Sequence, residues 1–206
     1  MGTLRSVNVG RPRRFDHHGR TAASAIWKTP VDGPVLARGV NLEGDDQADR
    51  SVHGGPDKAV YAYAVEDQEA FVAEGFDVQA GTFGENLTIE GVDLSGALVG
   101  ERWQIGTVEL EVSEPRLPCF KLGVRMDDPA FVRTFAQARR PGTYLRIVTE
   151  GTLQRGDAVH VRSRPDHDLT VRDIFEIYLF RKDQAARLLE VSGVSQGWRD
   201  WAAKHA

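Results

Sequence analysis

The chain has 206 residues, a net charge of −4 and a single cysteine. This length fits one domain, or one domain with an appendage, and the ordinary apolar content is enough to bury a core. The acidic balance lacks the basic footprint of a nucleic-acid binder, and no run approaches the roughly 20 apolar residues of a membrane helix. One cysteine excludes an intramolecular disulfide, and no charged-then-apolar leader opens the chain. We therefore expect a cytoplasmic protein without membrane or nucleic-acid partners.

The N-terminal half reads mostly as short strands. Residues 4–9 alternate with the period of a β-strand, and a Gly- and Arg-rich loop is expected to follow as far as Gly19. Residues 66–74 have the pattern of a short helix that Gly75 ends. Further strands are expected at 24–27, 35–42 and 59–63.

A polar stretch at residues 43–58 interrupts this pattern and contains the run His53-Gly54-Gly55-Pro56. Paired glycines permit positive φ angles and a close approach of the backbone to a ligand. Bare N–H groups in such a turn can form a nest for an anion, and Lys58 adds a point charge suited to phosphate. From spacing alone, however, a solvated hairpin loop with a surface histidine is favoured, because Gly-Gly turns are common.

Residues 81–89 form a second Gly-rich turn, which leads into a strand. Asn86 in this turn is either a side-chain clamp or an ordinary turn residue, and the sequence alone favours the latter. Two strands at 101–105 and 108–112 then form a hairpin around Gly106-Thr107, which leads into the segment that contains the cysteine.

That segment, Ser113–Arg125, reads SEPRLPCFKLGVR. Cys119 lies between two prolines and the basic residues Arg116, Lys121 and Arg125. The proline before the cysteine suits a turn or a first helical position, so we expect a strand, a kinked turn and a short helix opened by Cys119. Nearby cations favour the reactive thiolate. A small, buried and inert cysteine is an equally good interpretation of the residues alone.

Helices are expected at 120–125 and 129–139, a turn at 150–151, and strands at 143–149 and 158–161. Many short strands bounded by turns, with few helices, are typical of a small β-barrel.

The composition shifts after Val161. A capping-box pattern at Thr170 opens the first of three short amphipathic helices, so we expect a barrel domain at 1–163 and a helical domain at 164–206. A bundle this small needs to dock on the barrel to be stable. Its aromatic stripe, Trp198 and Trp201 included, is interpreted as packing; a sharper hypothesis is that the tail borders the site and receives a redox partner.

Four stretches together resemble the MOSC-domain family, named for the C-terminal domain of molybdenum cofactor sulfurases. They are GDDQADRSVHGGPDKAVYAYAVE, GTFGENLTIEG, EPRLPCFKLGVR and the closing helical segment. The chain is most similar to the YiiM-like members with a "3-alpha" domain. The resemblance implies a mainly β (α+β) fold, a MOSC-type β-barrel with short flanking helices followed by a small three-helix segment. Ala64 departs from the proline expected after Tyr-Ala-Tyr, which concerns only how the strand ends.

The resemblance also implies a chemistry. Cys119 would be a ligand to molybdenum in a pyranopterin cofactor, and a soft thiolate suits such a metal. The family's enzymes reduce N-hydroxylated compounds of the hydroxylaminopurine or amidoxime type to amines. Electrons would come from a separate donor protein, which we expect to be a flavoprotein reductase.

The resemblance assigns cofactor-binding roles to residues with positive charge or exposed N–H groups. The first candidates to hold the phosphate or the pterin are His53, Lys58 and Arg116, and the second candidates are Lys28, Gly54, Gly55 and Asn86. His53 or Asp57 could instead relay protons, and the sequence does not decide between them.

Two alternatives remain open at this point. The protein could carry or store the cofactor without turnover, or it could be a sulfur carrier that uses a persulfide on Cys119. Molybdenum analysis separates a sulfur carrier, which holds no metal, from a reductase or a cofactor carrier. A reduction assay with an artificial electron donor then separates the reductase from the cofactor carrier.

Overall fold

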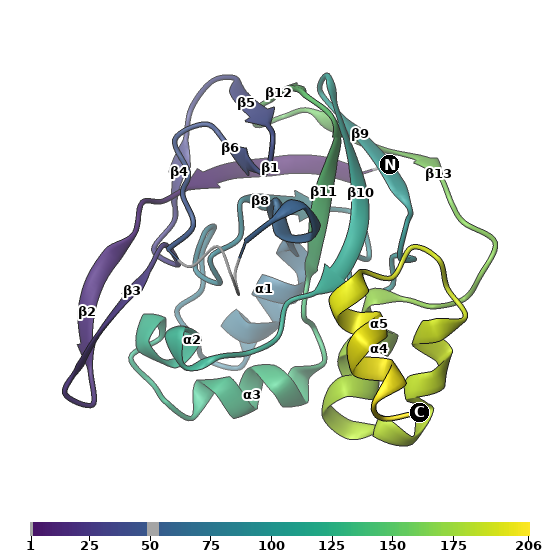
Figure 1. Cartoon of the computed structure of the whole chain (residues 1–206). Coiled ribbons are helices and arrows are strands. Elements are labelled where there is room, and N and C mark those ends of the chain that lie inside the picture. The colour runs from purple at the N-terminus through teal and green to yellow at the C-terminus, as the bar shows by residue number, and fades with distance from the viewer. Residues whose placement is uncertain (1, 49–53) are drawn as a thin grey trace.

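The computed structural model describes residues 2–48 and 54–206, and Figure 1 shows the arrangement of their elements. The strands are β1 (Gly2–Val9), β2 (Arg13–His17), β3 (Arg20–Ser24), β4 (Thr29–Val31), β5 (Val35–Arg38), β6 (Asn41–Leu42), β7 (Val60–Ala64), β8 (Leu87–Glu90), β9 (Arg102–Ile105), β10 (Val108–Pro115), β11 (Thr143–Thr149), β12 (Gly151–Leu153) and β13 (Ala158–Ser163). The helices are η1 (Pro56–Lys58), α1 (Val65–Ala73), α2 (Phe120–Arg125), α3 (Phe131–Ala138), α4 (Val171–Phe180), η2 (Lys182–Leu189) and α5 (Gln196–Ala203), where η marks a 3₁₀ helix.

The main sheet closes on itself. Its strand order is β13-β9-β10-β11-β7-β8-β1-β4, and a further pairing of β1 with β13 joins the first strand of the chain to the last. Only β7 and β8 run parallel among the described pairs of this sheet. The predicted mainly β fold with a closed barrel is confirmed, and closure leaves few unpaired edges for other chains to bind.

Strand β10 illustrates why these residues form a barrel. Val108, Leu110 and Val112 are fully buried and alternate with the half-buried Glu109 and Glu111. This period of two places one row of side chains in the barrel core and the other outside. The strand ends at Pro115, beyond which the chain turns away towards Cys119.

A second core lies below one end of the barrel, between β7 and the helices α1 and α3. Phe71, Phe83, Phe131 and Phe135 are all fully buried there. The rings of Phe71 and Phe83 lie 5.3 Å apart between centroids in an edge-to-face arrangement, the geometry that aromatic quadrupoles favour. This packing fixes the position of the loops that surround Cys119.

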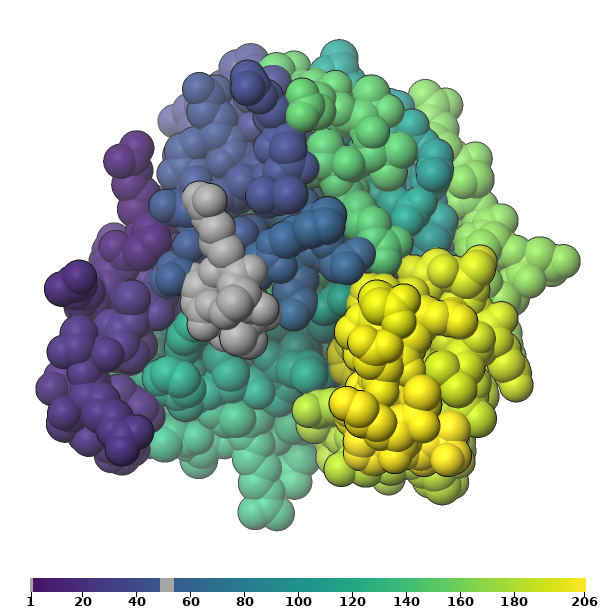
Figure 2. All heavy atoms as spheres, viewed as in Figure 1, coloured from purple at the N-terminus to yellow at the C-terminus, as the bar shows by residue number. Residues whose placement is uncertain are grey.

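The C-terminal segment docks against the barrel, as Figure 2 shows for the yellow atoms beside the teal and green body. The predicted capping box is present, because Thr170 and Asp173 exchange side-chain and backbone hydrogen bonds at the start of α4. The backbone N–H of Val99 donates to Leu169, and Val171 packs in the barrel core. The division at residue 163 stays a prediction, but the tail shares core residues with the barrel. Its second helix, η2, has 3₁₀ geometry.

The expected loop before Gly19 was wrong. Residues 13–17 and 20–24 form the hairpin β2–β3, which turns at His18 and Gly19 with positive φ angles of 51° and 72°. Two successive positive φ angles match the twist of a two-residue hairpin turn. The hairpin escaped sequence reasoning because half of its strand residues are exposed and no alternation of buried apolar residues marks it.

Three smaller expectations also need correction. The strand expected at 24–27 ends at Ser24, and the residues after it line a pocket instead. The strand expected at 35–42 is divided into β5 and β6 by a turn that includes Gly39, whose φ is +61°. The turn expected at 150–151 leads at once into β12, which pairs with β5. In the described part of the chain, no helix is long and apolar enough to span a membrane.

Candidate functional site

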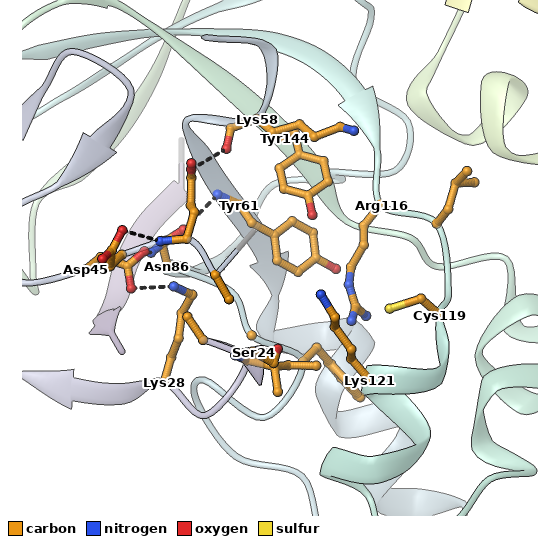
Figure 3. Close-up of a pocket in the computed structure, with 18 residues that line it drawn as sticks. Ser24, Lys28, Asp45, Lys58, Tyr61, Asn86, Arg116, Cys119, Lys121 and Tyr144 are labelled. Atoms are coloured by element: carbon orange, nitrogen blue, oxygen red, sulfur yellow. Dashed lines mark hydrogen bonds and ion pairs between the residues drawn. The ribbon is translucent and has the colours of Figure 1, made fainter. Parts of the chain in front are cut away.

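Cys119 lies where the barrel, helix α2 and the C-terminal segment meet. The expected order of strand, turn and short helix is present: β10 ends at Pro115, and Cys119 is the extended residue that precedes α2. Its side chain is half-buried, and its sulfur is free of any disulfide. Figure 3 shows the sulfur pointing towards the guanidinium of Arg116.

A pocket on one side of Cys119 is rich in cations, and we call it the cationic pocket. Its empty volume, open mouth included, is about 680 Å³. It is lined by Ser24, Ala25, Ile26, Lys28, Asp45, Asp46, Gln47, Ala48, Lys58, Tyr61, Phe83, Gly84, Asn86, Arg116, Leu117, Cys119, Lys121 and Tyr144. Five of the sequence-predicted residues therefore share one pocket: Lys28, Lys58, Asn86, Arg116 and Cys119.

Arg116 is the most unusual group in this pocket. Its side chain is only 6% exposed, and its guanidinium carbon lies 5.6 Å from the ring centroid of Tyr61 and 5.3 Å from that of Phe135. No carboxylate pairs with it among the described residues, and its Nη1 atom has no hydrogen-bond partner there. Aromatic faces only partly compensate a buried cation, so this side chain is prepared to receive an anion or a hydrogen-bond acceptor.

Lys28, by contrast, is already neutralised. Its amine forms a short ion pair with Asp45, and both side chains are buried. Burial lowers the pKa of Lys28, although Asp45 opposes this effect. Asp45 also accepts from the backbone N–H of Gly10 and from the amide of Asn86, at 2.7 and 2.9 Å.

The amide of Asn86 is likewise fully engaged. Its oxygen accepts from the N–H of Tyr61 at 3.1 Å, and its nitrogen donates to Asn8 and Asp45. Of the two interpretations that the sequence allows for Asn86, a side-chain clamp and an ordinary turn residue, these contacts support the clamp. It ties β7 and β8 to the ion pair of Lys28, and a direct contact with a cofactor stays a prediction.

The Gly-rich turn before Asn86 packs directly against the chain at Lys28. A Cβ atom at Gly81, where φ is +85°, would lie 2.5 Å from the carbonyl oxygen of Lys28. Inside this turn the buried carboxylate of Glu85 accepts from the N–H groups of Gly81 and Phe83, at 2.6 and 3.0 Å. Burial raises the pKa of Glu85 to about 7, and these hydrogen bonds limit the rise. Gly81 and Glu85 do not line the cationic pocket themselves, so they support its wall from behind.

The polar stretch around η1 supplies the remaining predicted residues. Gly55 has a φ of +92°, as the paired glycines allow, and it caps η1. The carboxylate of Asp57 forms an ion pair with Arg146 at 2.6 Å, so its predicted proton relay would have to work from within that pair. Lys58 lies 3.5 Å from Glu114. His53 lies outside the described residues, so its two predicted roles stay predictions.

A second pocket opens on the other side of Cys119, between the barrel and the C-terminal helices, and we call it the aromatic pocket. It is lined by Gly54, Asp57, Lys58, Glu114, Pro115, Leu117, Pro118, Cys119, Tyr144, Tyr178, Ser195, Gly197, Trp198 and Trp201. Cys119, Lys58, Leu117 and Tyr144 line both pockets. The thiol therefore stands at the junction of a polar and an aromatic compartment.

Sequence reasoning missed several residues of this site. Asp45, Tyr61 and Tyr144 carried no local signal, although Tyr61 belongs to a strand that was predicted. Burial raises the pKa of Tyr144 to about 12, and it raises that of Tyr61 well above the ordinary value. Both phenols therefore stay protonated as hydrogen-bond donors. The hydroxyl of Tyr61 already donates to the carbonyl oxygen of Pro141 at 2.7 Å, whereas Tyr144 and Lys121 both line the cationic pocket (Figure 3).

The arrangement joins a soft nucleophile, buried donors and an aromatic chamber. In residues 2–48 and 54–206, no three or more His, Cys, Asp or Glu side chains are grouped to hold a metal ion. An anionic ligand that approaches Cys119 from the cationic pocket would meet Arg116 and Lys121, and it would leave the aromatic pocket open to a second molecule.

Comparison with known proteins matches this picture. A family model described as the MOSC domain matches residues 49–160. Protein YiiM of Escherichia coli (strain K12) is 33% identical over 183 residues, which cover 85% of this chain and 81% of that protein. A protein named "Reductase" from Gibberella moniliformis is 34% identical over 171 residues, 80% of this chain but 30% of its own length. The crystal structure of YiiM from Geobacillus stearothermophilus superposes with a TM-score of 0.81 at 28% identity, covering 100% of this chain and 99% of that one.

Proposed function

This chain belongs to the MOSC-domain family, and on that premise we propose that it is a molybdenum-cofactor-dependent oxidoreductase that reduces N-hydroxylated compounds to amines. The name of one relative, "Reductase", supports the class of reaction. The observation that carries the proposal is the position of Cys119. On one side its half-buried thiol faces Arg116, a buried arginine that pairs with no carboxylate among the described residues, and on the other side it faces the aromatic pocket.

The residues present fit a cofactor of this kind. Arg116 has a buried nitrogen without a partner among the described residues, and such a group is costly unless a ligand accepts from it. Lys58 and Lys121 line the same pocket and can attract a phosphate, although Glu114, 3.5 Å from Lys58, already offsets part of that lysine's charge. Lys28 adds no net charge there, because Asp45 neutralises it. We therefore assign the anionic part of the cofactor to Arg116, Lys58 and Lys121, and the metal to the thiolate of Cys119.

When bound, the cofactor would supply the redox chemistry, in which an N–OH group, two electrons and two protons give an N–H group and water. The protein's share is to bind, orient and deliver protons. Glu114 is the described carboxylate best placed to hold a proton beside Cys119, because burial raises its pKa and both residues line the aromatic pocket. Lys58, at 3.5 Å from Glu114, limits that rise. A relay through His53 or Asp57 is the alternative.

The reduction of an N–OH group to an amine needs two electrons, which the proposal takes from another molecule. We propose a separate donor protein of the flavoprotein-reductase type. The test compares turnover with a flavoprotein reductase against turnover with a small artificial reductant. A chain that reduces substrate with the artificial reductant but with no flavoprotein tested would contradict this choice of donor.

The main experiment is expression in a host that makes the molybdenum cofactor, followed by metal analysis and a reduction assay with hydroxylaminopurine. We expect about one molybdenum per chain, bound through the thiolate, and formation of the amine. Metal without turnover would indicate a cofactor carrier. Protein without metal, but with a persulfide on Cys119, would indicate a sulfur carrier, and either result overturns the proposed enzyme.

A further inference from the structure

The hairpin β2–β3 concentrates positive charge outside both pockets. The chain from Arg11 to Arg20 contains four arginines and one carboxylate, that of Asp16, although the whole protein has a net charge of −4. The four arginines are Arg11, Arg13, Arg14 and Arg20. All four are exposed, none lines a pocket described above, and none forms an ion pair with a residue that the structure describes. Unpaired charge gathered in this way attracts an acidic partner.

Both ends of the hairpin are fixed to the wall of the cationic pocket. Before β2, the backbone N–H of Gly10 donates to the carboxylate of Asp45 at 2.7 Å, and the last residue of β3, Ser24, lines the pocket. The ring of Phe15 lies 5.3 Å from that of Trp27 in an edge-to-face arrangement. In Figure 1, β2 and β3 extend from the barrel on the side of α2, whereas the C-terminal helices lie on the other side. A protein that docks on the hairpin would therefore come close to the pocket that the thiol lines.

One face of the hairpin turns towards the barrel, and we call it the inner face. Successive residues of a strand point to opposite faces, and residues paired across two strands share a face. Phe15 packs against Trp27, so the face of Phe15 is the inner one. The exposed Arg13 shares this face, because it lies two residues before Phe15. The exposed Arg20 shares it too, because it pairs with His17, two residues after Phe15. Neither strand places a carboxylate on the inner face.

The opposite, outer face carries a different charge, although the same strand supplies it. Arg14 and Asp16 both point to it, so a positive and a negative charge are neighbours there. The carboxylate of Asp16 also accepts from the backbone N–H of Gly19 at 3.0 Å, which closes the turn. A short hairpin closed in this way holds its arginines in a fixed arrangement, which lowers the entropy cost of binding. Arg14 and Arg13 therefore form a matched pair, alike in type and exposure but on opposite faces.

We propose that the inner face of the hairpin is the docking surface for the electron donor, and that this donor is an acidic flavoprotein. Arg13 and Arg20 pair with carboxylates around the donor's flavin, which brings the flavin towards the pocket that the thiol lines. For each amine formed, the reduced flavin is oxidised and gives up two electrons and two protons, which convert N–OH to N–H and water. The inference rests on the proposed function for the use of the electrons, but not for the binding of an acidic protein.

A nucleic acid fits this surface less well than an acidic protein does. The positive charge is confined to one hairpin, whereas a nucleic acid carries a long row of phosphates. The rest of the chain is acidic, because the net charge is −4 despite the arginines of the hairpin, and it would repel such a polyanion. An acidic protein can place its carboxylates against the inner face alone.

The binding experiment uses flavodoxin, an acidic protein that carries FMN, as the probe. Calorimetric titration compares the wild-type protein with Arg13→Glu and with the matched control Arg14→Glu, at a salt concentration of about 0.1 M. We expect Arg13→Glu to bind flavodoxin about 5- to 20-fold more weakly, because like charges then face each other. Adding Arg20→Glu should raise the loss to about 100-fold. Arg14→Glu should stay within about 2-fold of the wild type, because salt screens charges that lie more than about 10 Å apart.

A kinetic readout ties the surface to the delivery of electrons. With reduced flavodoxin as the donor, kcat/KM for the donor should fall in Arg13→Glu by about the same factor as binding. With a saturating concentration of reduced methyl viologen, a small donor that needs no docking surface, turnover should equal that of the wild type, because Arg13 lines neither pocket. Equal losses with both donors would mean that the substitution disturbs the site, and they would overturn the role of the hairpin.

Binding and turnover can fail separately. If no protein reduces any substrate but the binding pattern holds, the proposed function fails and the docking surface stands. If the wild type does not bind flavodoxin, or if Arg13→Glu binds it as tightly as Arg14→Glu does, the docking surface is overturned whatever the turnover. If charge reversal prevents folding, Arg13→Gln and Arg14→Gln take the place of the two variants, with an expected loss of about 3-fold in the first alone.

A DNA duplex of about 20 base pairs tests the competing occupant under the same conditions. We expect the wild-type protein to bind it more weakly than it binds flavodoxin. Tighter binding of the duplex, lost in Arg13→Glu, would assign the inner face to a nucleic acid and overturn the proposal.

Discussion

The two pockets that meet at Cys119 differ in how much of their chemistry is already satisfied. In the cationic pocket, Lys28 is paired with Asp45, but Arg116 is buried without a carboxylate among the described residues. In the aromatic pocket, Tyr178, Trp198 and Trp201 pack against one another, and Glu114 holds Ser195. Among the described residues that line the two pockets, the buried side-chain nitrogen without a hydrogen-bond partner is thus that of Arg116, in the cationic pocket. A buried charge without a partner is costly, so the cationic pocket should hold an anionic ligand tightly, as a resident cofactor requires. The side chains of the aromatic pocket already pack against one another, so a ligand there can exchange more readily, as a substrate requires.

The largest effect is expected from Cys119→Ser, which breaks the link between the two pockets. Serine is similar in size, but it deprotonates far less readily and is a harder ligand. Mutation of a residue that only hydrogen-bonds a metal ligand typically lowers metal affinity or activity by about 10- to 100-fold. Loss of the ligand itself should therefore reduce turnover by more than about 100-fold. Molybdenum content should fall with it, while the melting temperatures of the cofactor-free variant and the cofactor-free wild type stay equal.

The matched control for that variant is Phe120→Leu. Phe120 is the next residue, is 43% exposed and lines neither pocket, so metal and activity should remain. Wild-type molybdenum content in Cys119→Ser would contradict the assignment of the thiolate as a metal ligand.

Asp45→Asn removes the negative charge that pairs with Lys28 in the cationic pocket. The amine of Lys28, whose side chain is 8% exposed, would remain buried and unpaired. We expect a loss of about 3–5 kcal/mol in the free energy of unfolding, measured by urea denaturation. Adding Lys28→Met should restore most of this loss, because the charge is then gone. A double variant as unstable as the single one would show that Asp45 acts through Gly10 and Asn86 instead.

Arg116→Met separates stability from binding. Methionine has a similar length and removes a buried charge that has no carboxylate partner among the described residues, so the cofactor-free protein should be as stable as the wild type or up to about 2 kcal/mol more stable. Retention of the cofactor should fall about 10- to 100-fold, measured as pterin and molybdenum per chain after dialysis. Arg133→Met, a change at an exposed position of α3 outside both pockets, should affect neither quantity.

The smallest effect concerns Glu85, below the wall of the cationic pocket. Its pKa in the folded protein is about 7 against an ordinary 4.5, so the folded state binds more protons than the unfolded state between these values. Its contribution to stability is therefore fully present below pH 4.5 and is lost as the pH rises through 7. Across this window, the unfolding free energy of the wild type should fall by about 1–3 kcal/mol relative to Glu85→Gln. Parallel pH curves for the two proteins would contradict the raised pKa.

How far the sequence predicts this molecule depends on which faces are buried. Strands with one buried face, such as β10, show the alternation that reveals them. The hairpin β2–β3 has little buried surface, so only its turn residues carry a signal, and it was missed. Segments near Cys119 could be interpreted because Arg116 and Lys121 are close to it in sequence.

Other parts of the site depend on contacts between distant segments. Asp45 is 17 residues from Lys28 and 41 from Asn86, and nothing in its own neighbourhood distinguishes it from the other acidic residues of its loop. The aromatic stripe of the tail was interpreted as packing, which is correct for the buried Trp198. Only the three-dimensional structure shows that Tyr178 and Trp201, the half-buried members of the stripe, line the same pocket as Cys119.

The pairing of β1 with β13 also has a consequence for how the protein is made. Strand β1 is synthesised before both of its partners in the ring, so it must wait for β8 at Leu87–Glu90 and for β13 at Ala158–Ser163 before the ring can close. Contacts between such distant residues form slowly, and the exposed edges of a half-made sheet tend to bind other chains. The stretch that the family model matches, residues 49–160, lacks β1 and Lys28 altogether. If residues 49–160 were expressed alone, the sheet that carries Cys119 could not close, and the edges of β8 and β13 that pair with β1 would be left unpaired.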